Sequence, residues 1–337
     1  MDPAEPGKAI VNGPDAVIPS AAEVSVDVVI PVYNPGRDGK LLQALTRLYS
    51  QTQRPGRVIL MNTEESLYRP WAEKENVEKR FPDLIVRHLS VGEFDHAATR
   101  NAGAALSDAP YILYMTMDAV PADNDLIRSL RESFSEHRDC AIAYARHLPD
   151  EGADLPERCA RALNYPSRPM WKTLEDEKRL GIRASFASNV CAMYSRRIFD
   201  ELGGFRAPAI FNEDMVFAHA ALHAGYGICY CADARVIHSH NYSAGEQFHR
   251  NFDLGVSQAM HPEVFSGVSS EKEGIVLVRM SVRKLAGHGQ RRKIPGYLFT
   301  CAARYAGYFL GKRYRRLPRR LVLKCTNQPV FWTKTAD

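Results

Sequence analysis

Between Val26 and Met115, short β-branched apolar runs alternate with segments of helical spacing, and this alternation restricts the fold more than any other feature of the sequence. Turn-forming residues follow the apolar runs, as they follow buried strands. Strands that alternate with helices pair in parallel, so we predict an α/β fold with a mostly parallel, doubly wound sheet flanked by helices. The predicted strands are Val26–Val32, Arg57–Met61, Leu84–Leu89 and Tyr111–Met115, and the predicted helices are Lys40–Gln51 and Asp95–Leu106.

Polar side chains stand at the ends of three of these strands. Asn34, Asn62 and Asp118 occupy such ends, and ligands of doubly wound sheets bind beyond the carboxyl ends of the strands. A carboxylate at Asp118 can hold a divalent cation against a diphosphate, although an aspartate in that place can also cap the next turn. Arg100, on the second predicted helix, suits either a phosphate contact or an ordinary surface position.

Further candidate residues lie downstream. Glu213 and Asp214 open a predicted helix, where the helix dipole favours acidic residues, so they are either a helix-start feature or a catalytic pair. His238 and His240 share one face of a predicted strand that ends at His240, and they are either metal ligands or core histidines. Residues 150–185 are polar and contain several prolines, so we predict an irregular excursion over the site there.

Composition and charge divide the chain into three parts. The net charge of +5 conceals fifteen Lys and Arg residues, with no Asp or Glu, from Gly274 to Ala336. We predict a disordered leader over residues 1–24, a folded α/β domain over residues 25–260 and a basic, helical region over residues 261–337. The seven cysteines are odd in number and lack a Cys-x-x-Cys pair, which favours a reducing, cytoplasmic compartment. No uncharged apolar run approaches the roughly 18 residues of a bilayer span.

The basic region contains a segment with the pattern of an interfacial helix. Within Tyr297–Leu310, apolar and aromatic residues form one face, which Arg304 interrupts, and five arginines follow between residues 313 and 320. This pattern favours docking on an anionic membrane surface. Packing of the helix on the α/β domain and a nucleic-acid patch are alternatives. No nucleic-acid partner is expected, because aromatic and basic residues are not interleaved inside the folded domain.

Five motifs follow one another in a characteristic order. They are Pro31-Val32-Tyr33-Asn34, Thr99-Arg100-Asn101-Ala102-Gly103, Thr116-Met117-Asp118, Gly203-Gly204-Phe205 and Glu213-Asp214. From Val26 to about Gly255, this order resembles that of the family 2 glycosyltransferases. The resemblance implies a GT-A catalytic domain, a Rossmann-like α/β fold, followed here by the basic helical extension. It also implies a nucleotide-sugar donor.

Shorter strings resemble the bacterial rhamnosyltransferase branch of that family. They are Phe94-Asp95-His96, Asp118-Ala119-Val120-Pro121, the segments 238–243 and 248–255, and the late pair Phe331-Trp332. Enzymes of this branch transfer L-rhamnose from dTDP-rhamnose to a lipid-linked or polysaccharide acceptor. The resemblance therefore implies dTDP-rhamnose as the favoured donor and a glycan or lipid-linked glycan as acceptor. Together with the cysteine content and the basic segment, it predicts an enzyme in the cytoplasm, peripheral at the inner face of the cell membrane.

Two departures from the family pattern affect the expected site. Thr116 replaces the first carboxylate of the usual metal motif, so Asp118 is expected to hold the cation with help from His238 or His240. Asn62 replaces the aspartate that usually meets the nucleotide base. An amide can still pair with the imide edge of thymine or uracil, because it offers both a donor and an acceptor.

The resemblance implies a single inverting displacement at the anomeric carbon. Asp214 would remove the proton of the acceptor hydroxyl as general base, and Glu213 would orient the acceptor or raise the pKa of its neighbour. A divalent ion, Mg²⁺ or Mn²⁺, would stabilise the departing diphosphate. The ion is expected on Asp118, His238 and His240. The donor contacts are expected at Pro31, Tyr33, Asn34, Asn62, Arg100 and Asp118.

Two rival hypotheses stay open at this point. The same fold could use another donor, such as UDP-galactose or UDP-glucose, which a panel of donors would separate. The chain could also be a non-catalytic nucleotide-sugar-binding scaffold that recruits partners to the membrane, an idea that Thr116 in the metal motif favours. A glycoside hydrolase is disfavoured, because no motif requires a second carboxylic acid with a raised pKa.

Overall fold

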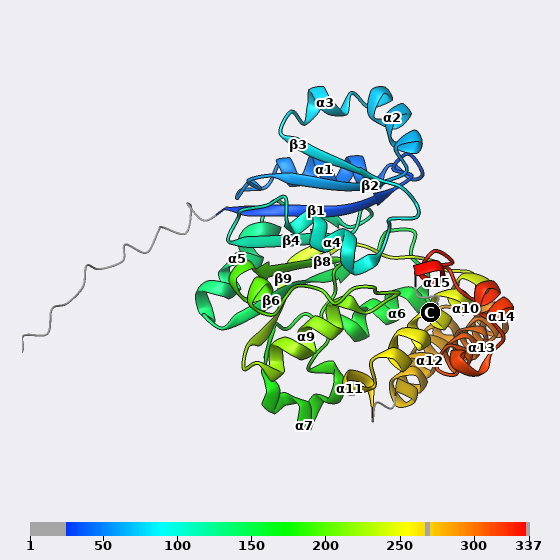
Figure 1. Cartoon of the computed structure of the whole chain (residues 1–337). Coiled ribbons are helices and arrows are strands. Elements are labelled where there is room, and N and C mark those ends of the chain that lie inside the picture. Colours follow the sequence, from blue (N-terminus) through cyan, green and yellow to red (C-terminus); the bar gives the residue numbers. More distant parts are fainter. Residues whose placement is uncertain (1–24, 267–269, 335–337) are drawn as a thin grey trace, which may run out of the picture.

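The computed structural model describes residues 25–266 and 270–334. The predicted leader, residues 1–24, lies outside the described residues. Within them, a nine-stranded sheet carries helices on both faces, and the C-terminal helices lie together at one side of it (Figure 1). The α/β class predicted from the sequence is confirmed, and so is the helical character of the C-terminal region.

The first half of the sheet is parallel. It contains four strands in the order β3, β2, β1, β4, and these are the strands predicted from the apolar runs. Val32 of β1 lies beside Asn62 of β2, which in turn lies beside His88 of β3, so the carboxyl ends of these strands meet at one edge. The bounds are Val26–Tyr33 for β1, Val58–Thr63 for β2, Leu84–Leu89 for β3 and Tyr111–Met115 for β4.

The second half of the sheet is mixed. β8 runs antiparallel to both β4 and β6, so β6 and its parallel neighbour β9 again run in the direction of β4. β5 and β7 pair with β9 in antiparallel fashion. The carboxyl ends of β6 and β9 therefore lie at the same edge as those of β1, β2 and β4. The bounds are Val120–Pro121 for β5, Cys140–Leu148 for β6, Met170–Lys172 for β7, Cys191–Ser195 for β8 and Gly227–Ile237 for β9.

Apolar side chains bury the two faces of the sheet under different helices. Leucines of α1 and α5 enter the core on one face, and small and aromatic side chains of α4, α8 and α9 fill the other. Gly103 lets α4 approach β1, because a Cβ atom there would lie 2.4 Å from Val29 Cγ1. The bounds are Lys40–Tyr49 for α1, His96–Ala104 for α4, Leu126–Glu136 for α5, Arg196–Glu201 for α8 and Glu213–His223 for α9. Two short helices, α2 (Glu65–Lys74) and α3 (Val77–Arg80), connect β2 to β3.

Residues 150–185 are more regular than we predicted. They contain α6 (Leu155–Asn164), β7, and α7 (Glu177–Leu180) between two 3₁₀ turns. The prediction was wrong because we took the prolines as helix breakers. Pro156 lies in the first turn of α6, where proline is tolerated.

In the C-terminal region, α11, α13 and α14 pack on α10 (Ala244–Met260), and α12 packs on α6 and α13. Gly307 and Gly311 of α13 touch the backbone of α10, and Cβ atoms there would lie 2.1 Å from the carbonyl oxygens of Phe248 and Phe252. Arg304, which interrupts the apolar face of α13, has a hydrogen-bond partner in this interface. Its Nε donates to Asn251 Oδ1 of α10 at 3.2 Å. The bounds are Pro262–Phe265 for α11, Ser270–Gly287 for α12, Ile294–Gly311 for α13, Arg319–Cys325 for α14 and Phe331–Lys334 for α15.

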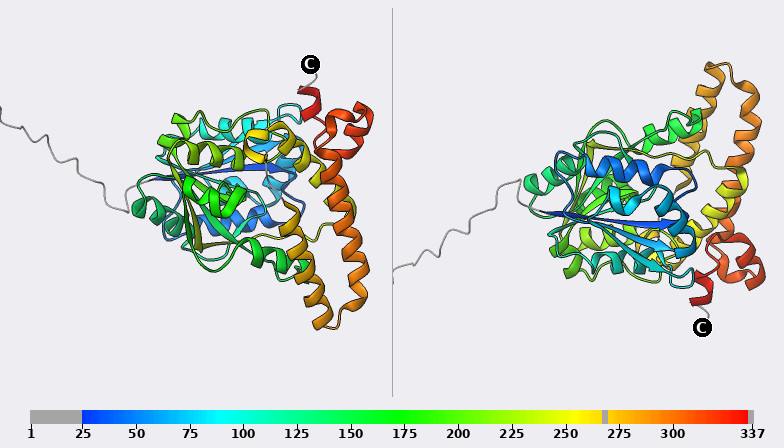
Figure 2. Two further views of the ribbon diagram at one scale, coloured as in Figure 1. Left: turned by 90° about the horizontal axis from the view of Figure 1, so that it is seen from below. Right: turned by 90° about the horizontal axis from the view of Figure 1, so that it is seen from above.

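Two views from below and above show α12 and α13 meeting at a connection that points away from the sheet (Figure 2). Over the parts of the chain that the structure describes, none of the helices combines the length and the apolar character needed to cross a membrane.

The glycines of α13 give a test of this packing. We expect Gly307→Ala to lower the free energy of unfolding by about 1–3 kcal/mol, because the added methyl group must push α13 away from α10. Gly296→Ala is the matched control, since this glycine of the same helix has open space around its Cβ position. Alanine there should stabilise the helix by up to about 1 kcal/mol. Denaturant unfolding measures both, and equal effects of the two substitutions would contradict the interface.

Candidate active site

The loop after β1 meets the loop after β4. The backbone N–H of Tyr33 donates to Met117 Sδ at 3.5 Å, so the Pro31–Asn34 motif touches the loop that carries Asp118. Asn34 adopts a left-handed conformation with φ of 51°, which turns the chain sharply after the strand. The ring of Tyr33 is 57% exposed. An exposed aromatic ring at this edge is free to contact a ligand.

Asn62 lies deeper, at the end of β2. Its side chain is fully buried, and its Nδ2 lies 3.0 Å from His88 Nδ1. Its Oδ1 is buried and has no hydrogen-bond partner among the described residues. A buried acceptor without a partner costs free energy. This oxygen is therefore suited to a donor N–H from a ligand.

Asp118, His238 and His240 form a three-residue cluster. Asp118 Oδ2 lies 3.0 Å from His240 Nε2 and 3.5 Å from His238 Nε2, and the two imidazole nitrogens are 3.1 Å apart. The register of β5 and β9 explains the contact. Val120 pairs with Ile237 in antiparallel fashion, and this register carried two residues further places Asp118 between the two histidines. We predicted both histidines within the last strand, but β9 ends at Ile237 and they follow it.

The cluster has the chemistry of a divalent metal site. Its three ligand atoms lie within 4.8 Å of one another. Burial raises the pKa of Asp118, but hydrogen bonds from the two histidines outweigh it and hold that pKa well below its usual range. Burial lowers the pKa of His238, and a neutral imidazole is the form that binds a metal. Two imidazoles and one carboxylate suit Mn²⁺ better than Mg²⁺, which prefers oxygen ligands. The residues present therefore fit a divalent cation.

Glu213 and Asp214 begin α9 as an adjacent carboxylate pair, with Glu213 buried and Asp214 partly exposed. Arg100 Nη1 lies 3.2 Å from Glu213 Oε1. Asn189 contacts both acids, because its Nδ2 donates to Glu213 Oε1 at 3.1 Å and its backbone N–H donates to Asp214 Oδ2 at 3.0 Å. The hydroxyl of Tyr194 donates to Asn189 Oδ1 at 2.8 Å and so fixes the orientation of the amide. Asn189 thus holds the two carboxylates in a defined arrangement.

The two acids have opposite pKa shifts. Burial, and next the charge of Glu213, raise the pKa of Asp214 to about 7. Burial also acts to raise the pKa of Glu213, but Arg100 and His96 outweigh it and lower that pKa below its usual value. Glu213 therefore stays ionised, while Asp214 can accept and release a proton near neutral pH. This is the behaviour that a general base needs.

One short segment before β8 connects the metal cluster to the carboxylate pair. The backbone N–H of Thr116, two residues before Asp118, donates to the carbonyl of Val190 at 3.1 Å. The neighbouring Asn189 is the residue that bonds Asp214. The loop that carries Asp118 and the carboxylate of Asp214 therefore bond adjacent residues of the same segment.

Buried rings make a second connection between the same two groups. His147 stacks on Tyr165 with ring centroids 3.9 Å apart and meets His238 edge-on at 5.6 Å. Burial raises the pKa of Tyr165 to about 12, and the nearby negative charge of Asp214 adds to that rise. Tyr165 is therefore linked to His238 through the ring of His147 and lies within reach of the charge of Asp214.

Arg100 is not at an open surface. We predicted a phosphate contact for it, but its side chain is buried, and Nη1 donates to the carbonyl of His96 as well as meeting Glu213. The phosphate contact stays a prediction, and the observed partner is Glu213. The next residue of the motif, Asn101, exchanges two hydrogen bonds with the backbone of Phe205, at 2.7 and 3.0 Å. The motif of α4 therefore ties the turn at Gly203-Gly204-Phe205 to the site.

Sequence reasoning missed several residues of the site, above all Asn189, Tyr165, His147 and His96. Asn189 stands before an apolar run, and nothing in its local spacing separates it from a loop residue. Tyr165 lies in the segment 150–185 that we predicted over the site, but nothing in the sequence singled out this residue. His147 belongs to a segment that the sequence did not connect to the site. These contacts come from strand pairing between distant segments, which local periodicity does not encode.

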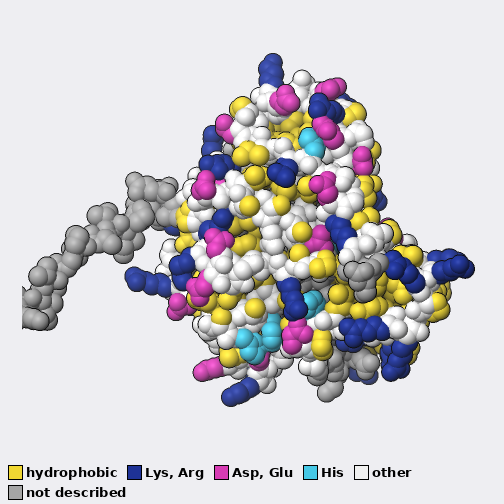
Figure 3. All heavy atoms as spheres, viewed as in Figure 1, with side chains coloured by type: hydrophobic (Ala, Val, Ile, Leu, Met, Phe, Trp, Pro, Cys, Tyr) yellow, Lys and Arg dark blue, Asp and Glu magenta, His cyan; other side chains and the backbone are white. Residues whose placement is uncertain are grey.

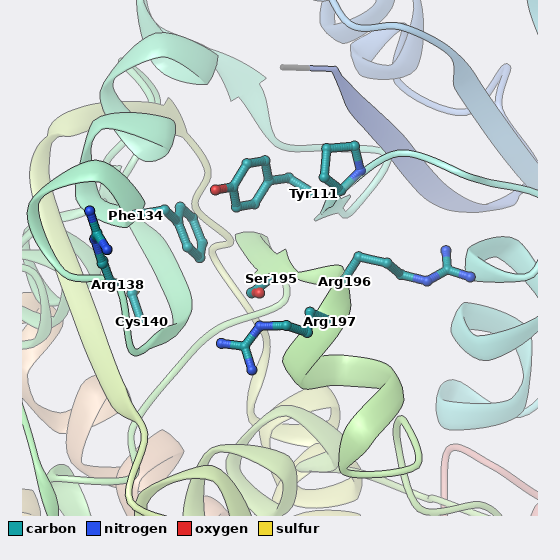
Figure 4. Close-up of a pocket in the computed structure, with 8 residues that line it drawn as sticks. Tyr111, Phe134, Arg138, Cys140, Ser195, Arg196 and Arg197 are labelled. Carbon is teal, nitrogen blue, oxygen red and sulfur yellow. The ribbon is translucent and has the colours of Figure 1, made fainter. Parts of the chain in front are cut away.

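A separate cavity of about 450 Å³ lies at the opposite edge of the sheet (Figure 4). Its lining includes Tyr111, the first residue of β4, and Ser195, the last residue of β8. None of the candidate catalytic residues lines it, so it does not belong to the carboxylate site.

The comparisons with known proteins agree with this geometry. The family model described as glycosyl transferase family 2 matches residues 27–203, more than half of the 337-residue chain. The chain belongs to glycosyltransferase family 2. It is therefore an enzyme, and the hypothesis of a non-catalytic scaffold is not needed to explain its motifs.

Two relatives resemble this glycosyltransferase over most of their length. It is 34% identical over 299 residues to the O-antigen chain rhamnosyltransferase RfbN of Salmonella typhimurium, covering 88% of this chain and 92% of RfbN. It is 32% identical over 298 residues to the O-antigen chain rhamnosyltransferase WbaN of Salmonella anatum, covering 87% of this chain and 91% of WbaN. The resemblance to the rhamnosyltransferase branch is thereby confirmed.

Solved structures share the fold at low sequence identity. The mannosyltransferase PcManGT from Pyrobaculum calidifontis, in complex with GDP-Man and Mn²⁺, superposes with a TM-score of 0.51 at 16% identity, covering 96% of this chain and 89% of PcManGT. Residues 1–349 of TarS from S. aureus superpose with a TM-score of 0.50 at 14% identity, covering 87% of this chain and 91% of that one. These likenesses show the GT-A fold.

The buried ion pair of the site can be tested through stability. We expect Arg100→Met to lower the free energy of unfolding by about 3–5 kcal/mol, because it leaves Glu213 buried without its cation. The double variant Arg100→Met/Glu213→Gln should lose clearly less than Arg100→Met alone, since no uncompensated Glu213 charge remains. Denaturant unfolding measures both variants. An equal loss in the two would show that the charge pairing is not what stabilises the site.

Proposed function

We propose that this glycosyltransferase transfers L-rhamnose from dTDP-L-rhamnose to a hydroxyl of a polysaccharide or lipid-linked glycan, with inversion at the anomeric carbon. The observation that carries the choice of sugar is the similarity to two O-antigen chain rhamnosyltransferases over most of both chains. A cytoplasmic enzyme at the inner face of the cell membrane fits this reaction. All seven cysteines lie unpaired among the described residues, which supports a reducing compartment.

Asp214 acts as the general base in this proposal. An acceptor hydroxyl is a poor nucleophile, and removal of its proton during attack accelerates such reactions by about 10²–10⁴. A carboxylate with a pKa near 7 combines a useful ionised fraction with enough basicity to take that proton. Glu213 remains charged and raises the proton affinity of its neighbour. Arg100 and Asn189 position Glu213, and Asn189 also positions Asp214.

Asp118, His238 and His240 hold a divalent cation in this proposal, and Mn²⁺ is the better candidate. The presence of Mn²⁺ with GDP-Man in the PcManGT complex supports a metal in the shared fold. Such a cation supplies positive charge that stabilises the departing diphosphate. Thr116 leaves the loop after β4 with one carboxylate fewer than the family pattern, and the two histidines make up the ligand set.

The donor nucleoside lies against the loops after β1 and β2 in this proposal. The exposed ring of Tyr33 can contact the base or the ribose, and Pro31 and Asn34 shape the turn around it. Asn62 Oδ1, which is buried and has no partner among the described residues, suits the imide N–H of thymine. Uracil presents the same N–H, so this contact alone does not choose between dTDP and UDP donors.

A donor panel tests the proposal directly. We expect the purified full-length chain with Mn²⁺ and acceptor to release nucleotide from dTDP-L-rhamnose and not from UDP-galactose or UDP-glucose. The matched control is Asp214→Asn, which keeps the shape of the side chain. It should bind the donor with unchanged affinity while turnover falls by about 10²–10⁴. Faster turnover of a UDP sugar by the wild-type chain would refute the choice of donor, and full activity of Asp214→Asn would refute the base.

We further propose that the C-terminal region, residues 261–337, binds an anionic membrane. It would thereby hold the catalytic domain, residues 25–260, at the membrane surface. One side of α13 packs on α10, and the other leaves large apolar side chains in solvent. Phe299 is 70% exposed and Tyr305 is 53% exposed. Lys and Arg side chains gather on the same side of the molecule, among apolar patches (Figure 3). An apolar helix face flanked by basic groups suits the interface of a bilayer. Packing and docking therefore use different faces of one helix.

Vesicle binding tests the docking surface. We expect the chain to bind vesicles that contain anionic lipid, and to lose binding as salt rises, because screening weakens the attraction of the basic groups. Phe299→Ser should weaken this binding. Leu174→Ser is the control, since Leu174 is also exposed but lies far from the basic region in sequence. Equal binding to neutral vesicles at high salt would refute the electrostatic part, and an unchanged Phe299→Ser variant would refute the role of α13.

A further inference from the structure

A second group of metal-ligating side chains lies at the far end of α9. Glu177 of α7 meets His219 and His223, which are four residues apart and so share one face of α9. Figure 3 shows histidine side chains gathered on the surface in this part of the molecule. α9 thus carries the catalytic pair at its first residues and this histidine pair in its last two turns. None of the steps proposed above uses the histidine pair.

The separations of the ligand atoms match a shared ion. Glu177 Oε1 lies 3.5 Å from His219 Nδ1 and 3.2 Å from His223 Nε2. In a tetrahedral site with bonds of about 2.0–2.2 Å, two ligand atoms lie about 3.3–3.6 Å apart. One carboxylate oxygen is therefore placed correctly toward both imidazoles, from a different element of the fold. Two imidazoles and one carboxylate are a known ligand set for Zn²⁺, with the fourth position open.

The two histidine rings lie close together on the surface of α9. The two imidazole rings lie only 4.1 Å apart between centroids, so two protonated rings would repel each other. A simple ion pair with Glu177 can satisfy one ring as a cation. A divalent cation satisfies both rings in their neutral form.

The α7 segment has few other anchors. Neither α7 nor the 3₁₀ turns on either side of it contribute a fully buried residue, and Leu180 packs against the core only partly buried. A segment without fully buried side chains gains little stability from the hydrophobic effect. It nevertheless belongs to the connection that leads from β7 to Asn189, the residue that bonds both catalytic acids. A bond between α7 and α9 would therefore fix this connection at a second point.

We propose that Glu177, His219 and His223 bind a divalent transition-metal ion, with Zn²⁺ as the best fit, and that the ion pins α7 to α9. The site is structural and separate from the cluster at Asp118. Mg²⁺ and Ca²⁺ are excluded as natural occupants, because they prefer oxygen ligands over imidazole. The inference does not depend on the identity of the donor or the acceptor.

Zn²⁺ titration by calorimetry tests the site in the full chain. The starting protein carries Asp118→Asn and His240→Ala, so that the cluster at the active site does not contribute. We expect one equivalent of Zn²⁺ to bind this protein. Adding His219→Ala, or separately Glu177→Gln, should weaken that binding by at least about tenfold. His288→Ala is the matched control, since His288 is an exposed histidine on another helix connection, and it should leave the binding unchanged.

Hydrogen exchange supplies a second readout that does not depend on activity. Zn²⁺ should slow amide exchange over residues 174–183 in the starting protein and leave it unchanged in the His219→Ala variant. Unfolding curves without metal establish that the variants still fold. Two results would overturn the proposal: no bound Zn²⁺ in the starting protein, or unchanged binding after both His219→Ala and Glu177→Gln.

Discussion

Two adjacent carboxylates, the buried Glu213 and the partly exposed Asp214, stand at the start of α9, and much of the site follows from how their charge is accommodated. Two negative charges side by side in a largely desolvated place repel each other strongly. Arg100 approaches Glu213 to 3.2 Å, and Asn189 donates to both acids. The negative charge therefore resides on Glu213, and the proton affinity of Asp214 rises. The same contacts that keep the buried Glu213 ionised also make Asp214 a base near neutral pH.

The motifs of the family acquire physical roles in this arrangement. Gly103 lets α4 lie close to β1. Arg100 of the same helix is thereby close enough to form an ion pair with the buried Glu213. Asn101 exchanges two hydrogen bonds with the backbone of Phe205 and so holds the turn that precedes α9. Arg100, for which the family resemblance implied a donor contact, is here paired with Glu213. In the proposed function, the donor contacts fall to side chains with free surface or free acceptors, such as Tyr33 and Asn62.

The fold was predictable from the sequence where the information is local. β1 to β4 follow from apolar runs of strand length, and the start of α9 follows from acidic residues at a helix N-terminus. Asp118 and Asp214 were singled out on the same basis. The pairing of His238 and His240 with Asp118 was only one of two readings, because it depends on the register of β5 against β9. Such registers join segments more than 100 residues apart, so the local periodicity of apolar residues in the sequence does not predict them.

Other parts were not predictable for similar reasons. Asn189 reaches the carboxylate pair only because β8 reverses direction beside β4, which places the residues before β8 at the active edge. Arg100 reads as an exposed helix residue until its partner on α9 is known. The region 150–185 was predicted as irregular because its prolines were taken as breakers, whereas Pro156 begins a helix. In each case the decisive contact is tertiary.

The pH dependence of kcat/KM in the wild-type chain and in Glu213→Gln tests the central claim most directly. An acid whose pKa is raised is protonated below that pKa, so the wild-type rate should rise as the pH passes through about 7. Glu213→Gln removes the charge that raises the pKa of Asp214, so the rising limb of the pH–rate profile should move to lower pH. Glu132→Gln, which removes an equal charge on α5, should leave the limb in place. A limb that stays at the same pH in Glu213→Gln would contradict the account, because the paired carboxylate would then not control the base.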